Sequence, residues 1–228
     1  GNIDNENNII PKKFLDMKSD RFRGLIGEKL VSNKFKNNND GFKFIENIHY
    51  YEEEDSKNSI ELDFILEDDN YLILGSVKNI KLNPKMKQKV FNSQTEQTRR
   101  FHEALIKNKK LEIYEKIKKE GKEEVSKVDS IFFNENKKII HLGISIEFIS
   151  DYIFNFETPK KVNEKFINQS IISYSDFSVL LSLINLTDYV GYLSERSEFS
   201  KTIRTKHNLE FKDFSYFDDE FIHFNLYL

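Results

Sequence analysis

Two apolar segments separated by a short acidic turn constrain the fold most. Residues 60–67 and 71–79 are rich in aliphatic and β-branched side chains, and the Asp-Asp-Asn turn 68–70 lies between them. This pattern predicts two antiparallel strands joined as a hairpin. Each segment also carries a charge within its apolar sequence, Asp63 in the first and Lys78 in the second. A tight hairpin can bring these side chains together, so the sequence predicts a polar site on a sheet.

The segments around the hairpin predict an α/β fold. Apolar residues recur at helical spacing over residues 20–36 and again over 84–109, while residues 42–51 alternate as a strand does. A Lys- and Glu-rich stretch, 107–127, predicts a solvated helix. Five further elements are expected after it, namely strands at 130–133 and 138–148, a helix with an apolar side at 177–184 that follows residues 170–174, a helix capped by Thr187 or Asp188, and a strand within 211–228.

Composition limits the classes of protein. The 228 residues are 38% hydrophobic and 32% charged, which is enough for a substantial core beneath a charged surface. Cys is absent, which excludes disulfides, Cys-ligated metals and a Cys nucleophile. Neither a membrane-length apolar run nor a signal-peptide pattern occurs, so we expect a cytoplasmic protein without a membrane partner. With a net charge of −3, binding to nucleic acid requires a local basic surface.

The charges on the hairpin suit metal-assisted hydrolysis. Because side chains alternate along a strand, Glu61 should share a face with Asp63, and Ser76 with Lys78. A carboxylate can hold Mg²⁺, and an ammonium can orient or deprotonate a water and offset charge at phosphorus. Glu28, on the preceding helix, can reach the same edge. Each charge taken alone is also compatible with an ordinary surface or strand-edge position, and only the combination favours phosphodiester hydrolysis.

Three motifs in this order resemble those of the PD-(D/E)XK nuclease superfamily: Gly27-Glu28, Glu61-Leu62-Asp63-Phe64-Ile65 and Ser76-Val77-Lys78. The resemblance covers residues 19–148. It implies that Asp63 is the principal metal ligand, Lys78 the catalytic lysine and Glu28 the acid contributed by the helix.

A fourth element lies on the helix expected after the lysine. Residues 97–101, Gln-Thr-Arg-Arg-Phe, are similar to the Gln-x-x-x-Tyr element of the RecB-like branch, with Phe101 in place of the tyrosine. The resemblance implies that Gln97 assists at the site. Arg99 and Arg100 are candidates for contacts with nucleic-acid phosphates, or they form only a solvated surface.

Ser76 departs from the family pattern, which has Glu or Asp at this position. A hydroxyl is a weaker ligand for a hard cation than a carboxylate. Three explanations stay open: the acid has moved to the next helix as Glu96; Glu61 and Glu28 bind the metal together with Asp63; or the chain binds without cutting, as a relative that lost activity or an inactivated variant. The helical wheel argues against Glu96, which lies nearly opposite the apolar face.

The resemblance implies a restriction-endonuclease-like α/β fold, a mixed central sheet flanked by helices. We expect a flexible N-terminus (1–18), a nuclease-like core (19–150), and C-terminal helices and a terminal strand packed on it (151–228). The expected function is Mg²⁺- or Mn²⁺-dependent endonuclease cleavage of DNA, more than of RNA. A role in antiviral defence or restriction, and a homodimer or larger defence complex, follow only by analogy. The alternatives are an inactive nucleic-acid-binding or assembly module and a structural partner protein.

Overall fold

The computed structural model describes residues 12–38, 40–51, 59–79, 84–119, 122–146, 161–162, 165–166 and 168–207. Its elements, in chain order, are α1 (Lys12–Asn37), β1 (Lys43–Tyr50), β2 (Ile60–Glu67), β3 (Tyr71–Lys78), α2 (Pro84–Asn108), β4 (Lys110–Lys119), β5 (Lys122–Phe132), β6 (Lys138–Ser145), β7 (Lys161–Val162), β8 (Lys165–Phe166), β9 (Asn168–Ser173), α3 (Tyr174–Leu183) and α4 (Leu186–His207). Within these ranges, none of the helices is long and apolar enough to cross a membrane.

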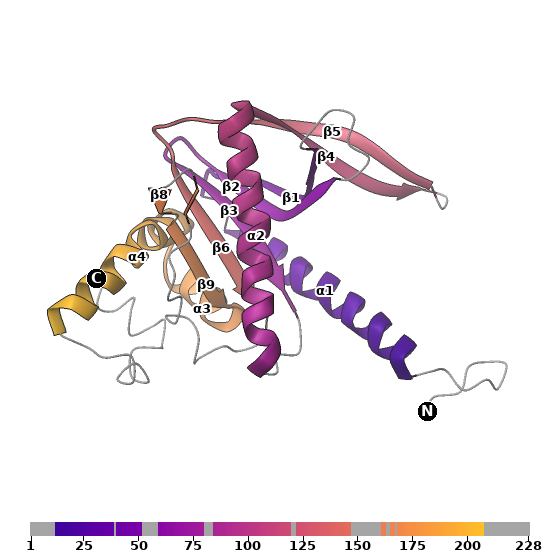
Figure 1. Cartoon of the computed structure of the whole chain (residues 1–228), viewed down its shortest axis with the longest axis horizontal. Coiled ribbons are helices and arrows are strands. Elements are labelled where there is room, and N and C mark those ends of the chain that lie inside the picture. The colour runs from indigo at the N-terminus through magenta and orange to yellow at the C-terminus, as the bar shows by residue number, and fades with distance from the viewer. Residues whose placement is uncertain are drawn as a thin grey trace.

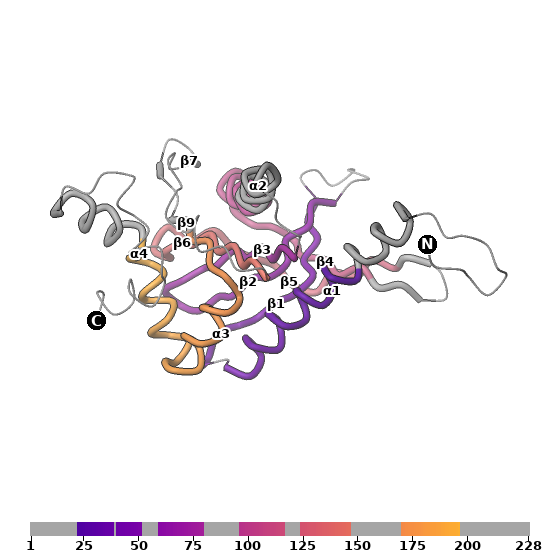
Figure 2. Tube along the Cα trace, turned by 90° about the horizontal axis from the view of Figure 1, so that it is seen from below, coloured from indigo at the N-terminus to yellow at the C-terminus, as the bar shows by residue number. Residues whose placement is uncertain are grey.

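A mixed seven-stranded sheet, in the order β5-β4-β1-β2-β3-β6-β9, forms the middle layer. Strands β1, β2 and β3 are antiparallel neighbours, whereas β6 runs parallel to β3 and β9 parallel to β6. Helix α2 lies across one face of this sheet (Figure 1). Helices α1 and α3 lie on the opposite face (Figure 2). The expected α/β class, with a mixed sheet between helices, is therefore confirmed.

The central hairpin forms as the sequence predicts. Strands β2 and β3 pair from Phe64 with Gly75 to Glu67 with Leu72. In the turn, a carboxylate oxygen of Asp68 accepts hydrogen bonds from the backbone N–H groups of Asn70 and Tyr71. An aspartate that binds the backbone two or three residues ahead stabilises a tight turn, which fixes the register of the hairpin.

Two hydrophobic cores hold the layers together. The core beneath α2 includes Phe101 and Leu105 of the helix. The larger core joins the sheet to α1, α3 and the first half of α4, and Phe35 and Phe177 are fully buried in it. Gly75 admits close packing here, because a Cβ atom at this position would lie 2.0 Å from the ring of Phe64.

The alternation of side chains changes phase at one place in the sheet. On β2, Leu62 is buried in the core beneath α2, but Phe64, two residues further, is buried in the opposite core. On the neighbouring strand, Asn47 has a positive φ of 54°. The simple alternation expected for β2 is therefore interrupted at Asp63, and the irregularity places this carboxylate between two faces of the sheet.

The prediction of a helix over residues 107–127 is wrong, because these residues form most of the β4–β5 hairpin. Leu111 and Ile113 alternate with polar residues and are buried beneath α2, which is the period of a strand. The tertiary contacts of these two side chains therefore outweigh the helix propensity of the surrounding Lys and Glu residues.

The C-terminal elements share the sheet and the larger core with the rest of the chain. Strand β9 is an element that the sequence did not predict, and the predicted cap of α4 is wrong. Asn185, rather than Thr187 or Asp188, accepts the hydrogen bond from the N–H of Asp188, and its amide donates back to that side chain. The carboxylate of Asp40 accepts from the N–H of Leu186, which ties α4 to the loop after α1. Residues 1–11 and 208–228 lie outside the described ranges, and α1 extends into the predicted flexible N-terminus.

Candidate active site

Asp63 and Lys78 meet where the β2–β3 ladder ends. Beyond the pair of Phe64 and Gly75, the backbone N–H of Val77 donates to the carboxylate of Asp63. The Lys78 ammonium lies 3.8 Å from the same carboxylate oxygen. Both side chains are largely buried, with exposed fractions of 7% for Asp63 and 18% for Lys78. The proximity of this aspartate and this lysine, expected from the sequence, is therefore present in the structure.

Gln97 joins α2 to the two strands. Its carbonyl oxygen accepts hydrogen bonds from the Lys78 ammonium at 2.9 Å and from the Ser76 hydroxyl at 3.1 Å. Its amide nitrogen lies 3.5 Å from the backbone oxygen of Glu61. Ser76 and Lys78 project toward α2 because they continue the alternation of Leu72 and Leu74, which are buried there. Gln97 thereby fixes the position of the ammonium.

Glu28 brings a further carboxyl group to this cluster from α1. Burial first, and then the negative charges of Asp63 and Glu61, raise its pKa from the ordinary value of 4.5 to about 7, against an opposing effect of Lys78. The neighbouring Gly27 allows α1 to approach the sheet, since a Cβ there would lie 2.8 Å from the side chain of Ile146. The charges of two carboxylates and one lysine therefore act on Glu28.

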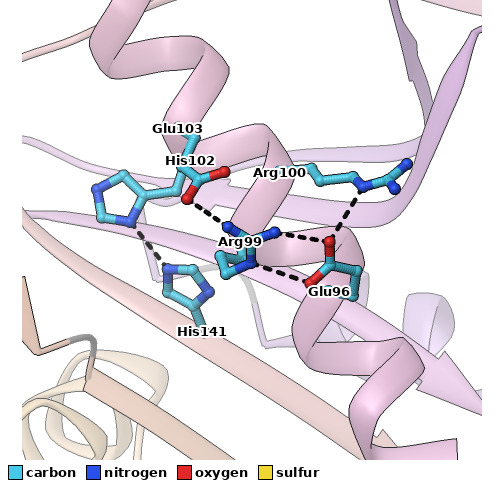
Figure 3. Close-up of polar contacts among 6 residues, drawn as sticks. All are labelled: Glu96, Arg99, Arg100, His102, Glu103 and His141. Atoms are coloured by element: carbon cyan, nitrogen blue, oxygen red, sulfur yellow. Dashed lines mark hydrogen bonds and ion pairs between the residues drawn. The ribbon is translucent and has the colours of Figure 1, made fainter. Parts of the chain in front are cut away.

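Glu96 is engaged on α2 with two arginines. It forms ion pairs with Arg99 at 2.7 Å and with Arg100 at 3.2 Å, and Arg99 also pairs with Glu103. Figure 3 shows these side chains together along one stretch of the helix. The guanidinium charges lower the pKa of Glu96. This environment disfavours Glu96 as the missing acid, and the predicted phosphate contacts of Arg99 and Arg100 would have to compete with these ion pairs.

Two histidines that the sequence analysis did not single out meet beside this stretch. Nδ1 of His102 lies 3.0 Å from Nε2 of His141, and Nδ1 of His141 lies 2.8 Å from the hydroxyl of Thr98 (Figure 3 shows the two rings). Burial lowers the pKa of His102 to about 4, so the ring is neutral at pH 7. The one available signal was a histidine within the apolar strand 139–144, because the two rings are 39 residues apart in the chain.

The donor set suits a hard divalent cation held by few protein ligands. Among the side chains that the structure describes, no three His, Asp or Glu residues form a group able to hold a metal ion. Mg²⁺, however, commonly binds through one or two carboxylates, with waters and substrate phosphates as its other ligands. Asp63 and Glu28 would be the two carboxylates of such a site, because the charges of Asp63 and Glu61, which add to the effect of burial in raising the pKa of Glu28, are charges that a cation would offset.

Comparison of the chain with protein-family models, with curated proteins and with solved structures found no match. Family membership is therefore not shown, and arguments about function rest on the site itself.

The environment of Glu28 makes stability depend on pH. Because its folded pKa of about 7 exceeds 4.5, the stabilising contribution of Glu28 is complete below pH 4.5 and is lost as the pH rises through 7. Without divalent metal, we expect Glu28→Gln to melt at the wild-type temperature near pH 5. At pH 8 the variant should melt about 2–4 °C above the wild type, because glutamine carries no charge to bury, and this range allows for solvent screening. Thermal unfolding followed by circular dichroism measures both, with Glu135→Gln as an exposed control. Equal melting temperatures of Glu28→Gln and wild type at pH 8 would contradict the crowding of carboxylates.

Proposed function

We propose that this chain is a divalent-metal-dependent nuclease of the PD-(D/E)XK type that hydrolyses phosphodiester bonds in DNA. The observation that carries the proposal is the convergence of Glu28, Asp63 and Lys78 from three different elements of the fold. A purely structural site has no need of a buried carboxyl group, Glu28, whose pKa is raised further by two neighbouring carboxylates.

The topology supports the proposal. The resemblance implies a helix, three strands, a helix and a further strand, and α1, β1, β2, β3, α2 and β6 follow this order. The β4–β5 hairpin is an addition between α2 and β6, and β9 with α3 and α4 extends the sheet beyond β6. Under the proposal, the acidic and basic side chains come from α1, β2 and β3, and the additions enlarge the scaffold.

Each residue takes a distinct part in the proposed reaction. Asp63 and Glu28 hold the cation, with Glu61 near them, and this arrangement favours the second explanation for Ser76. The cation would neutralise charge on the phosphate and lower the pKa of a bound water. Lys78 orients the attacking water and offsets charge developing on the phosphorus oxygens. Gln97 keeps the Lys78 ammonium in place through its carbonyl oxygen.

Asp63→Asn tests the metal site with little change in shape. The amide oxygen can still accept the hydrogen bond from Val77, so the strand ends stay joined. We expect wild-type protein to nick plasmid and single-stranded circles in Mg²⁺ or Mn²⁺, and to stop on chelation. Asp63→Asn should cut at least about 100-fold more slowly. Independently of activity, Mn²⁺ should raise the melting temperature of the wild type and not of the variant. Equal cleavage by both proteins would remove Asp63 from the mechanism.

The second candidate is a nuclease-like module that binds nucleic acid or assembles with partners without cutting. Ser76 favours it, because a buried hydroxyl bonded to Gln97 occupies the place where the family pattern has a carboxylate. Binding of DNA with no cleavage in any divalent metal would support this candidate over the enzyme. Roles in defence and assembly as a homodimer remain expectations by analogy.

A further inference from the structure

A single row of residues runs from the carboxylate cluster across the sheet. Glu61 of β2 pairs with His49 of β1, His49 with Tyr114 of β4, and Tyr114 with Lys127 of β5. Neighbouring strands are about 4.8 Å apart, so Tyr114 lies about 10 Å from Glu61 along this row. If a phosphate of a nucleic acid lies at the carboxylate cluster, the base of the neighbouring nucleotide can extend as far as Tyr114.

The row lies on the face of the sheet that α1 occupies. Glu61, His49 and Tyr114 are each next in sequence to residues buried beneath α2: Ile48, Tyr50, Leu62 and Ile113. Because successive side chains of a strand point to opposite faces, Glu61 and His49 project away from α2. The register of β4 with β5 shifts between Ile113 and Tyr114, and the ring of Tyr114 lies against that of Tyr51, which follows the buried Tyr50 and so points to the same side as His49. Glu28 is carried by α1, which lies on this side of the sheet (Figure 2).

Tyr114 of this row forms an aromatic pair with Tyr51, the residue that follows β1. The rings of Tyr51 and Tyr114 lie edge to face, with centroids 5.3 Å apart and an angle of 78° between their planes. Both side chains are partly exposed. An edge-to-face contact fixes the orientation of each ring relative to the other. At the end of the row, the Lys127 side chain is 51% exposed and forms an ion pair with Glu112.

We propose that Tyr51 and Tyr114 form a stacking site for an unpaired base, so that the substrate class is single-stranded DNA. The inference rests on the proposed function, because it places the base next to the phosphate that is cut in the proposed reaction. Bases stack on aromatic side chains whatever their sequence, and in an intact duplex these faces are already covered by neighbouring bases. Lys127 is placed to meet a backbone phosphate of the same strand.

The test measures binding in the full chain without cleavage. Fluorescence anisotropy of a labelled single-stranded oligonucleotide, in chelator, gives the dissociation constant, and the same sequence as a duplex is measured in parallel. We expect Tyr114→Leu and Tyr51→Leu each to weaken binding of the single strand about 5- to 100-fold, with little change for the duplex. Tyr114→Phe and Tyr51→Phe keep the rings and should stay near wild type. Melting temperatures show whether each variant is folded.

The outcomes separate this inference from the nuclease proposal. Single-strand binding that is unchanged in both leucine variants, or tighter binding of the duplex by the wild type, overturns the stacking site whether or not the protein cuts. Should a leucine variant fail to fold, quenching of a 2-aminopurine oligonucleotide on wild-type protein decides, and no quenching overturns the inference. Tyrosine-dependent binding without metal-dependent cleavage would keep the stacking site and remove the enzyme.

Discussion

Lys78→Ala is expected to lower the rate of DNA cleavage by about 10²–10⁴-fold. Its ammonium lies 3.8 Å from Asp63 and is fixed by Gln97, so it is a positive charge held in a mostly dry environment. A fixed charge of this kind stabilises the transition state without a reorganisation cost. Initial rates of plasmid nicking in saturating Mg²⁺ measure the effect.

Two further variants test whether the loss of cleavage comes from the missing charge of Lys78. Lys78→Met keeps the length of the side chain and removes only the charge, so it should be as inactive as Lys78→Ala. Lys138→Ala removes an exposed lysine on β6, beside the opposite end of β3, and should cut at the wild-type rate. Because loss of Lys78 leaves the buried Asp63 without its partner, rates are compared well below each melting temperature. Cleavage at the wild-type rate by Lys78→Met would contradict the proposed mechanism.

Phe35→Ala is expected to lower the free energy of unfolding by about 3–5 kcal/mol. Phe35 is 1% exposed, and its ring centroid lies 5.0–5.6 Å from the ring centroids of Phe44, Phe64 and Phe177. One side chain thus joins α1, two strands and α3, and its removal leaves a cavity among rings that cannot close over it. Urea unfolding followed by circular dichroism gives the change in free energy.

The same helix supplies a matched control. Phe22 is 65% exposed, so Phe22→Ala should change the free energy of unfolding by no more than about 0.5 kcal/mol. Because both variants make the same substitution on α1, their difference isolates burial from helix propensity. Equal effects of the two substitutions would mean that Phe35 does not anchor α1 in the larger core.

The central hairpin and the pairing of its charges could be predicted from the sequence because the information is local. Residues 68–70 specify the turn, and the turn sets which residues of the two strands lie near each other. Gln97 could be placed only by resemblance to a motif. Its contact with Lys78 depends on how α2 crosses the sheet, and this crossing is a tertiary property.

Other features depend on partners distant in the chain. The residues of the β4–β5 hairpin have enough Lys and Glu to suit a helix, and only packing against β1 and α2 makes Leu111 and Ile113 strand residues. The interruption of alternation at Asp63 requires two strands to distort together, and no sequence pattern in β2 announces it. The raised pKa of Glu28 likewise follows from the seating of α1 against the strands.

Strand β9 and helices α3 and α4 have a consequence for the size of the smallest fragment that can fold. A chain ending after β6 would lose the parallel neighbour of that strand and one wall of the larger core, including Phe177. It would also lose the bond between Asp40 and Leu186 that secures the loop after α1. Glu28 would then be carried on a helix that has lost its packing against α3. The carboxylates that face DNA in the proposed reaction thus depend on residues more than a hundred positions later in the chain, and a minimal catalytic fragment must include α3 and α4.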